Sequence, residues 1–183
     1  MEGNASGSTS PAVSRVPEWY GEVYAKLREQ DIEFFCYVPD AGLDPFIRMA
    51  QADRAVRPIV LTTEEEGIGI CVGAAMSGKR SVLMMQSSGV GNCINTFSLV
   101  TNCRVPFLLL VTMRGEFGEA VQWQVPMGKI AGDCLELCGF TVYRAERPSE
   151  VAFLVDGAAK LAWRSDERAA VLLTQRLIGP KEL

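Results

Sequence analysis

Histidine is absent from the 183 residues of this sequence. Catalysis by a Ser-His-Asp triad or by a Cys-His pair is therefore excluded, because both mechanisms need an imidazole as the general base. Long hydrophobic runs are also absent. The longest apolar window, VPFLLLVTM at residues 105–113, has the length of a strand, whereas a membrane-spanning helix needs about 20 apolar residues.

The sequence also has no long basic run, and its formal net charge is −4. Nucleic acid is therefore not expected as a partner. The first residues lack the charged-then-apolar order of a signal peptide, so we expect a cytoplasmic protein without a membrane partner. Hydrophobic residues make up 48% of the chain, which is enough for a substantial core in one domain.

Six cysteines are present, but no two of them form a CxxC motif. Cys134 and Cys138 lie four residues apart on an expected helix and could bind a metal together. Without histidine or a second pair nearby, we expect no metal site and reduced, mostly buried thiols; redox or metal-binding roles are the weaker alternative. The six are Cys36, Cys71, Cys93, Cys103, Cys134 and Cys138.

Residues 1–16 are small, polar and aperiodic, so we expect a flexible tail followed by a single domain over residues 17–183. In this domain, continuous apolar strands alternate with helical segments. The expected strands cover residues 32–38, 57–62, 81–86, 106–113, 140–145 and 169–175. This alternation predicts a doubly wound α/β fold, with a six-stranded parallel sheet and helices on both faces.

Ligands bind such sheets at the carboxyl ends of the strands. Three expected loops follow strands there: TTEEEG at residues 62–67, SSGVGN at 87–92 and TMRGEFGE at 112–119. A helix that starts in TTEEEG is expected to continue past residue 70, and another helix is expected over residues 93–103. The three loops are therefore the segments in which we look for a binding site.

Two nucleotide-binding motifs are only partly matched. GAAMSGKR at residues 73–80 has Arg80 where a P-loop needs Ser or Thr, and it runs from helix to strand instead of strand to helix. GVGNCI at residues 89–94 has Ile94 in place of the third glycine of the dinucleotide fingerprint, and no acid follows about 20 residues later. The glycines indicate either a tight turn or backbone amides that, with Asn92, face a ligand.

Three adjacent acids, Glu64, Glu65 and Glu66, stand at the expected start of a helix. At about 100° per residue, Glu64 lies roughly 30° from the centre of the apolar stripe of that helix, and Glu66 lies nearly opposite. The helix dipole favours acids at this position and suffices for Glu65 and Glu66. A carboxylate on a buried face needs a partner, however, so Glu64 is the candidate for proton exchange.

Residues 64–100, together with VPFLLLVTMRGE at 105–116 and VPMGK at 125–129, resemble a known family. They are similar to the α subunits of sulfopyruvate decarboxylases and to the N-terminal half of phosphonopyruvate decarboxylases. Both groups are thiamine-diphosphate-dependent 2-oxo acid decarboxylases. The resemblance covers about residues 17–178 and corresponds to the pyrimidine-binding (PYR) domain, with MQSSGVGN as its most specific part.

The resemblance implies roles for particular residues. In such enzymes an acid hydrogen-bonds N1′ of the cofactor's aminopyrimidine and so promotes removal of the thiazolium C2 proton. The acid stands nine residues before a helix glycine, here Gly73, which implies Glu64, with Glu65 in reserve if the register shifts. Further residues are implied to line the cofactor and substrate pocket: Gln86, Gly89, Gly91 and Asn92 for the cofactor, and Pro39, Asp40, Ser87 and Ser88 for the substrate.

The family holds the diphosphate and Mg²⁺ in a second domain with a GDG motif, and this sequence contains no GDG. The resemblance therefore implies a partner β subunit that carries that domain, in a heterotetramer or larger assembly. The implied reaction is decarboxylation of sulfopyruvate to sulfoacetaldehyde. Arg114 is the candidate for binding the sulfonate, with a surface salt bridge as an equal alternative, and Lys129 is a weaker candidate. Phosphonopyruvate or another anionic 2-oxo acid, or a non-catalytic assembly role for the PYR fold, are the alternatives.

Overall fold

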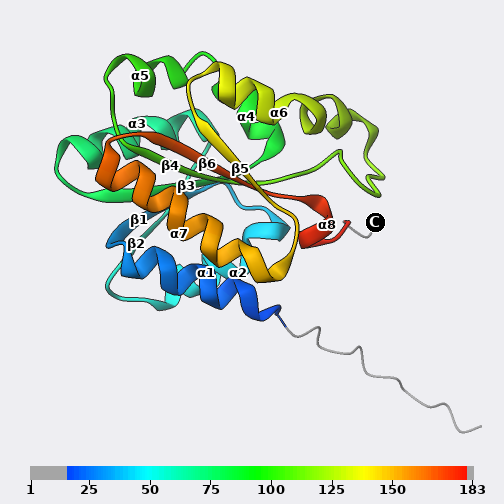
Figure 1. The fold of residues 1–183 in the computed structure, drawn as a ribbon, viewed down its shortest axis with the longest axis horizontal. Coiled ribbons are helices and arrows are strands. Elements are labelled where there is room, and N and C mark those ends of the chain that lie inside the picture. Colours follow the sequence, from blue (N-terminus) through cyan, green and yellow to red (C-terminus); the bar gives the residue numbers. More distant parts are fainter. Residues whose placement is uncertain (1–15, 181–183) are drawn as a thin grey trace, which may run out of the picture.

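The computed structural model describes residues 16–180 and forms a three-layer α/β structure (Figure 1). The tail expected at residues 1–16 lies, apart from Val16, outside the described residues. Six parallel strands form one sheet in the order β2-β1-β3-β4-β6-β5, which confirms the predicted doubly wound architecture. The strands are β1 (Ile32–Tyr37), β2 (Arg57–Val60), β3 (Arg80–Gln86), β4 (Phe107–Thr112), β5 (Thr141–Ala145) and β6 (Arg168–Leu173).

Helices cover both faces of the sheet (Figure 1). One face packs on α1 (Glu18–Glu29), α2 (Asp44–Ala52) and α7 (Pro148–Ser165). The other packs on α3 (Glu64–Met76), α4 (Ser87–Cys93), α5 (Phe97–Asn102) and α6 (Val125–Leu137). The short elements are η1 (Ala41–Leu43), η2 (Gln122–Gln124) and α8 (Gln175–Ile178).

The burial of each strand follows from its place in the sheet. The central strand β4 is buried at every residue, because helices cover it on both sides, and its sequence FLLLVT is correspondingly a continuous apolar run. The edge strand β2 is exposed at Arg57 and Val60, its first and last residues. The two cores lie on opposite faces of the same sheet. Because all strands are parallel, their carboxyl ends lie at one edge of the sheet, where the loops that follow different strands meet.

The helix α4 is the main departure from the expected elements. SSGVGN was expected to be a loop, but α4 starts at Ser87, directly after β3. Glycine and serine have low helix propensity, which tertiary packing overrides here, since Val90 and Cys93 are fully buried between the sheet and its neighbouring helices. The helix expected over residues 93–103 is consequently shorter and begins at Phe97.

All six cysteines are free thiols. Cys36, Cys71 and Cys93 are buried, two more are half-buried and Cys103 is exposed, so the prediction of mostly buried thiols is correct for half of them. Burial, with the nearby carboxylates of Glu65 and Glu64, raises the pKa of Cys93 above its usual value and keeps it protonated.

Within residues 16–180, no three His, Cys, Asp or Glu side chains gather as metal ligands. No helix in that range has both the length and the apolar character to cross a membrane.

Candidate active site at the strand ends

Glu64 is the first residue of α3, and its side chain is only 9% exposed. Its Oε2 atom accepts a hydrogen bond from Asn92 Nδ2 on α4, at 3.1 Å. The side chain also lies directly against Gly89, where an added Cβ would stand 2.5 Å from Glu64 Cγ and 2.6 Å from Oε1. The glycine and the asparagine of SSGVGN therefore fix the position of this one carboxylate.

The other two acids have different surroundings. Glu66 is exposed, and its Oε2 accepts a hydrogen bond from the backbone N–H of Thr62 at 2.8 Å, which caps the start of α3. Glu65 is half-buried, and its Oε2 is a buried atom with no hydrogen-bond partner among the described residues. The helix-terminus explanation thus has a direct contact for Glu66, whereas Glu64 is the acid that accepts a hydrogen bond from a side chain of α4.

A cavity of about 180 Å³ adjoins Glu64, and we call it the Glu64 pocket. It lies where β1 and β3 end and α3 begins, and an open groove beside it shares Pro39 and Asp40. Its lining residues are Val38, Pro39, Asp40, Glu64, Gln86 and Ser88. Five of the residues named from the sequence therefore meet in one place, although they come from three separate segments of the chain.

A chain of hydrogen bonds runs along one wall of the pocket. Ser88 Oγ donates to Gln86 Oε1 at 2.8 Å, and Gln86 Nε2 donates to Asp40 Oδ1 at 2.9 Å. Thr112 Oγ1 and the backbone N–H of Gly42 both donate to Asp40 Oδ2, at 2.9 and 3.1 Å. Asp40 thus joins the carboxyl ends of β1, β3 and β4, and each of its oxygens has a donor.

Two of the expected pocket residues lie elsewhere. Ser87 is fully buried, and its hydroxyl accepts from the backbone N–H of Arg114 at 3.1 Å, so it joins β3 to β4. Gly91 faces α6, where a Cβ would stand 3.0 Å from Met127 Sδ. Neither residue is among those that line the Glu64 pocket, because α4 is a helix and turns successive residues to different sides.

Arg114 also lies outside the Glu64 pocket. Its Nε and Nη2 atoms each donate to the Glu119 carboxylate at 2.7 Å, and the two side chains are 7% and 4% exposed. Arg114 lines a separate cavity of about 130 Å³ that shares only Asp40 with the Glu64 pocket. The sequence left open whether Arg114 binds substrate or forms a surface salt bridge. The structure shows a buried ion pair instead, and Lys129 is exposed on α6.

No family model matches this chain. Among curated proteins, it is 34% identical over 151 residues to the sulfopyruvate decarboxylase subunit alpha of Methanocaldococcus jannaschii, covering 82% of this chain and 89% of that subunit. The same subunit of Methanothermobacter thermautotrophicus is 35% identical over 152 residues, covering 82% and 92%. The chain belongs to the family of sulfopyruvate decarboxylase α subunits. The resemblance stated from the sequence is confirmed, and with it the assignment to a decarboxylase subunit.

Longer proteins match this α-subunit chain over part of their length. The phosphonopyruvate decarboxylase of Streptomyces viridochromogenes is 37% identical over 103 residues, which are 55% of this chain and 26% of that protein. Among solved structures, 2-oxoglutarate:ferredoxin oxidoreductase from Magnetococcus marinus superposes with a TM-score of 0.68 at 14% identity, over 87% of this chain and 29% of that one. The structural likeness shows that the fold is shared.

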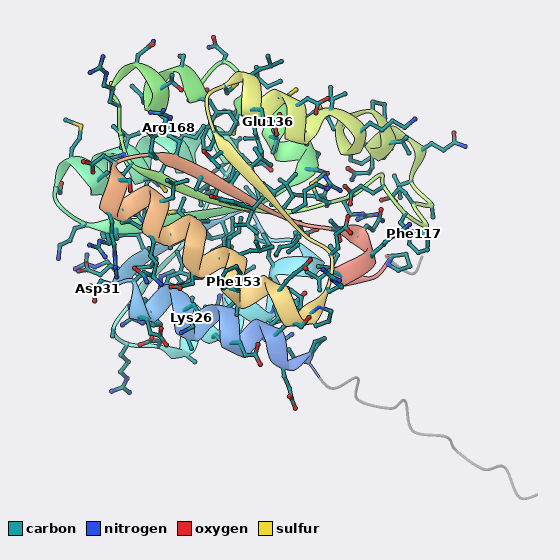
Figure 2. The ribbon with its side chains drawn as sticks, viewed as in Figure 1. Lys26, Asp31, Phe117, Glu136, Phe153 and Arg168 are labelled. Atoms are coloured by element: carbon teal, nitrogen blue, oxygen red, sulfur yellow. The ribbon has the colours of Figure 1, made fainter. Side chains whose placement is uncertain are left out.

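Sequence reasoning missed Thr112, Glu119 and Gln175 in this α subunit. Thr112 is the one polar residue at the end of the apolar strand β4, a signal that could have placed it at the pocket rim. Gln175 Oε1 accepts from the backbone N–H of Glu116 and Phe117, at 3.0 and 2.9 Å, and thereby holds the segment after β4 against α8. Figure 2 shows Phe117 in that segment, beside α8.

The Arg114–Glu119 ion pair of this α subunit makes a prediction about stability. Hydrogen bonding from Arg114 is the main cause that lowers the pKa of Glu119 from 4.5 to about 2. Its stabilising effect is therefore complete above pH 4.5 and is lost as the pH falls from 4.5 towards 2. We expect Glu119→Gln to lower the free energy of unfolding by about 3–5 kcal/mol at pH 7, because it leaves a buried guanidinium without its counter-ion.

Urea unfolding of the full chain at pH 7 and at pH 3 measures this effect. The difference between wild type and Glu119→Gln should shrink at pH 3, where the wild-type ion pair has already lost part of its contribution. Glu29→Gln is the matched control, because its pair with Lys26 is exposed and screened by solvent, so its removal should change the free energy of unfolding little. A difference that stays the same at both pH values would contradict the prediction.

Proposed function

We propose that residues 17–183 form the PYR domain of a heteromeric, thiamine-diphosphate-dependent decarboxylase that converts sulfopyruvate to sulfoacetaldehyde and CO₂. The observation that carries the proposal is the setting of Glu64 in a chain of this family. The carboxylate is nearly buried, is held by Asn92 and Gly89, and borders a pocket at the carboxyl ends of parallel strands. This is the edge at which α/β sheets bind ligands.

The residues of the pocket fit an aminopyrimidine. Asn92 Nδ2 donates a hydrogen bond to Glu64 Oε2, and no described residue hydrogen-bonds Oε1. The Oε1 atom is therefore left to bind a nitrogen of a ligand. The missing Cβ of Gly89 is what gives the carboxylate its space, and Val38 and Pro39 supply apolar surface beside it. We assign to Glu64 the task of holding a proton at the ring nitrogen and to Asn92 that of orienting the carboxylate. Thiamine diphosphate, when bound, supplies the electron sink for loss of CO₂.

The rest of the site is proposed to come from a β subunit. The sequence contains no GDG motif for the diphosphate and Mg²⁺. The relatives named as α subunits match this chain over 89–92% of their own length. By contrast, the sulfopyruvate decarboxylase of Methanosarcina acetivorans matches over only 22% of its length. The same segment thus occurs both as a subunit and as part of a longer chain, which supports a second subunit that binds diphosphate and Mg²⁺ in a heterotetramer or larger assembly.

Two expectations stay predictions at this point. The cytoplasmic location is one of them. The other is the choice of substrate, for which phosphonopyruvate is the main competitor, because a phosphonopyruvate decarboxylase matches 55% of this chain.

The alternative to a catalytic function is an assembly protein that keeps the PYR fold without catalysis. The intact contacts of Glu64 favour a catalytic role over it, since a scaffold has no need for a buried acid beside a cavity.

Reconstitution tests the proposal. The chain is mixed with a β-type chain that carries a GDG motif, taken from a neighbouring reading frame, together with thiamine diphosphate and Mg²⁺. CO₂ release is then measured from sulfopyruvate, phosphonopyruvate and pyruvate, with each chain alone as the control. We expect release by the mixture only, and fastest from sulfopyruvate. Turnover by this chain alone would refute the shared site, and a faster reaction with phosphonopyruvate would change the substrate.

A further inference from the structure

The Glu64 pocket has an unusual balance of charge for a site that takes an anionic 2-oxo acid. Two of its six lining side chains are carboxylates, Asp40 and Glu64, and two are the apolar Val38 and Pro39. The guanidinium of Arg114 is bound by Glu119, and Arg114 lines a different cavity. A substrate carboxylate needs hydrogen-bond donors, and the lining side chains of this chain that carry N–H or O–H donors are Gln86 and Ser88.

The hydrogen-bond chain decides between these two residues. A carboxylate can only accept hydrogen bonds, so the atom of Gln86 that faces Asp40 Oδ1 at 2.9 Å must be its nitrogen. Gln86 Oε1 then points the other way and receives the single hydroxyl proton of Ser88. Ser88 therefore has no proton left to give, whereas Gln86 keeps a second N–H. Gln86 is the lining residue with a spare side-chain donor.

We propose that Asp40 is a positioning residue that fixes the Gln86 amide, so that its second N–H donates to the carboxylate of the 2-oxo acid. Asp40 itself does not bind substrate, because its Oδ2 accepts from Thr112 and Gly42 and its Oδ1 accepts from Gln86. The inference rests on the proposed function, since it names the group that holds the substrate in that same pocket. It revises the expectation from the sequence, in which Asp40 was a substrate-contacting residue.

The geometry allows a selective variant. Thr112 and Gly42 both bind Oδ2, and Gln86 alone binds Oδ1. In Asp40→Asn, the new amide oxygen can keep the Oδ2 contacts while its NH₂ group replaces Oδ1. Gln86 must then turn its oxygen to that NH₂ group and its nitrogen to Ser88, which reverses the chain. The spare N–H of Gln86 then lies on the opposite side of the amide, away from the position that would hold the substrate carboxylate. In Asp40→Asn/Gln86→Glu the carboxylate at position 86 accepts from both neighbours again, but it has no N–H.

The experiment compares Asp40→Asn, Gln86→Glu and the double variant in the reconstituted enzyme, with sulfopyruvate as substrate. We expect Asp40→Asn to raise KM about 10- to 100-fold, with a change in kcat below about 3-fold, because a ground-state contact is lost. The double variant should keep the high KM. Asp44→Asn is the matched control: it removes the same charge from an exposed residue that pairs with Arg48, and it should leave KM unchanged.

A second measurement does not depend on activity. The urea midpoint of the full chain without its partner should fall in Gln86→Glu, which sets two carboxylates against each other, and change little in Asp40→Asn, where the reversed chain is satisfied again. It should return to the wild-type value in the double variant. The reason is that the double exchange again sets a donor, now at position 40, against an acceptor at position 86. Midpoint shifts that simply add would overturn the proposal, as would an unchanged KM in Asp40→Asn or a double variant with wild-type KM. A wild-type assembly that releases no CO₂ would instead refute the proposed function, and with it the substrate role of Gln86.

Discussion

Glu64→Gln is expected to lower kcat of the reconstituted decarboxylase by about 10²- to 10⁴-fold, the range that general acid–base groups supply. Glutamine has the same shape, and its amide oxygen can still accept the hydrogen bond that Asn92 Nδ2 donates to Oε2. What it cannot do is hold an exchangeable proton at the remaining oxygen. The loss therefore measures the proton-holding role of the carboxylate and not its packing against Gly89.

Glu66→Gln is the control for this experiment. It changes the same residue type in the same turn of α3, but Glu66 is exposed and only caps the helix through the backbone N–H of Thr62. Its turnover should stay within about 3-fold of wild type, since an exposed cap contributes stability and touches no substrate. Urea unfolding of both variants checks that they fold. Full turnover in Glu64→Gln, with normal folding, would remove Glu64 from the mechanism.

The sequence was sufficient to single out Glu64, for a physical reason. A helix places side chains at fixed angles, so the apolar stripe of α3 already showed which of three adjacent acids is directed inward, and the structure finds Glu64 9% exposed. The same reasoning failed for SSGVGN. Its glycines and serines carry no helical periodicity, and α4 forms because Val90 and Cys93 fill the space beside α3 and β3.

The hydrogen bonds between the pocket residues could not be predicted from the sequence. Asp40 and Gln86 are 46 positions apart, and Asp40 and Thr112 are 72 apart. They meet because the strand order places β1 beside β3 and β3 beside β4. Arg114 illustrates the same limit within six residues. Glu116 and Glu119 are both near in sequence, but Glu119 takes the guanidinium, whereas Glu116 accepts from Arg144 and from the backbone N–H of Gln175.

Gly89→Ala is expected to lower kcat about 10- to 100-fold while the protein stays folded. The new Cβ would stand 2.5–2.7 Å from Cγ, Oε1 and Cδ of Glu64, too close for any real contact. All three atoms belong to the end of one side chain, so Glu64 can turn away without moving the backbone. A displacement of the carboxylate by about 1 Å is enough for such a loss. Because Ala favours the helix over Gly, the free energy of unfolding should change by less than about 1 kcal/mol.

Gly132→Ala is the matched control, since it is also a glycine-to-alanine change within a helix. Its Cβ would meet only Leu172 Cδ1 at 3.4 Å, an ordinary contact, so kcat and the urea midpoint should both stay near wild type. Gly128→Ala marks the opposite extreme, because its Cβ would lie 1.9 Å from the backbone oxygen of Arg114 and the fold itself should be lost. A Gly89→Ala enzyme with wild-type kcat would show that the reaction tolerates a displaced Glu64. A Gly89→Ala chain that fails to fold would show that α4 cannot yield, and that the glycine is needed for packing before it is needed for the acid.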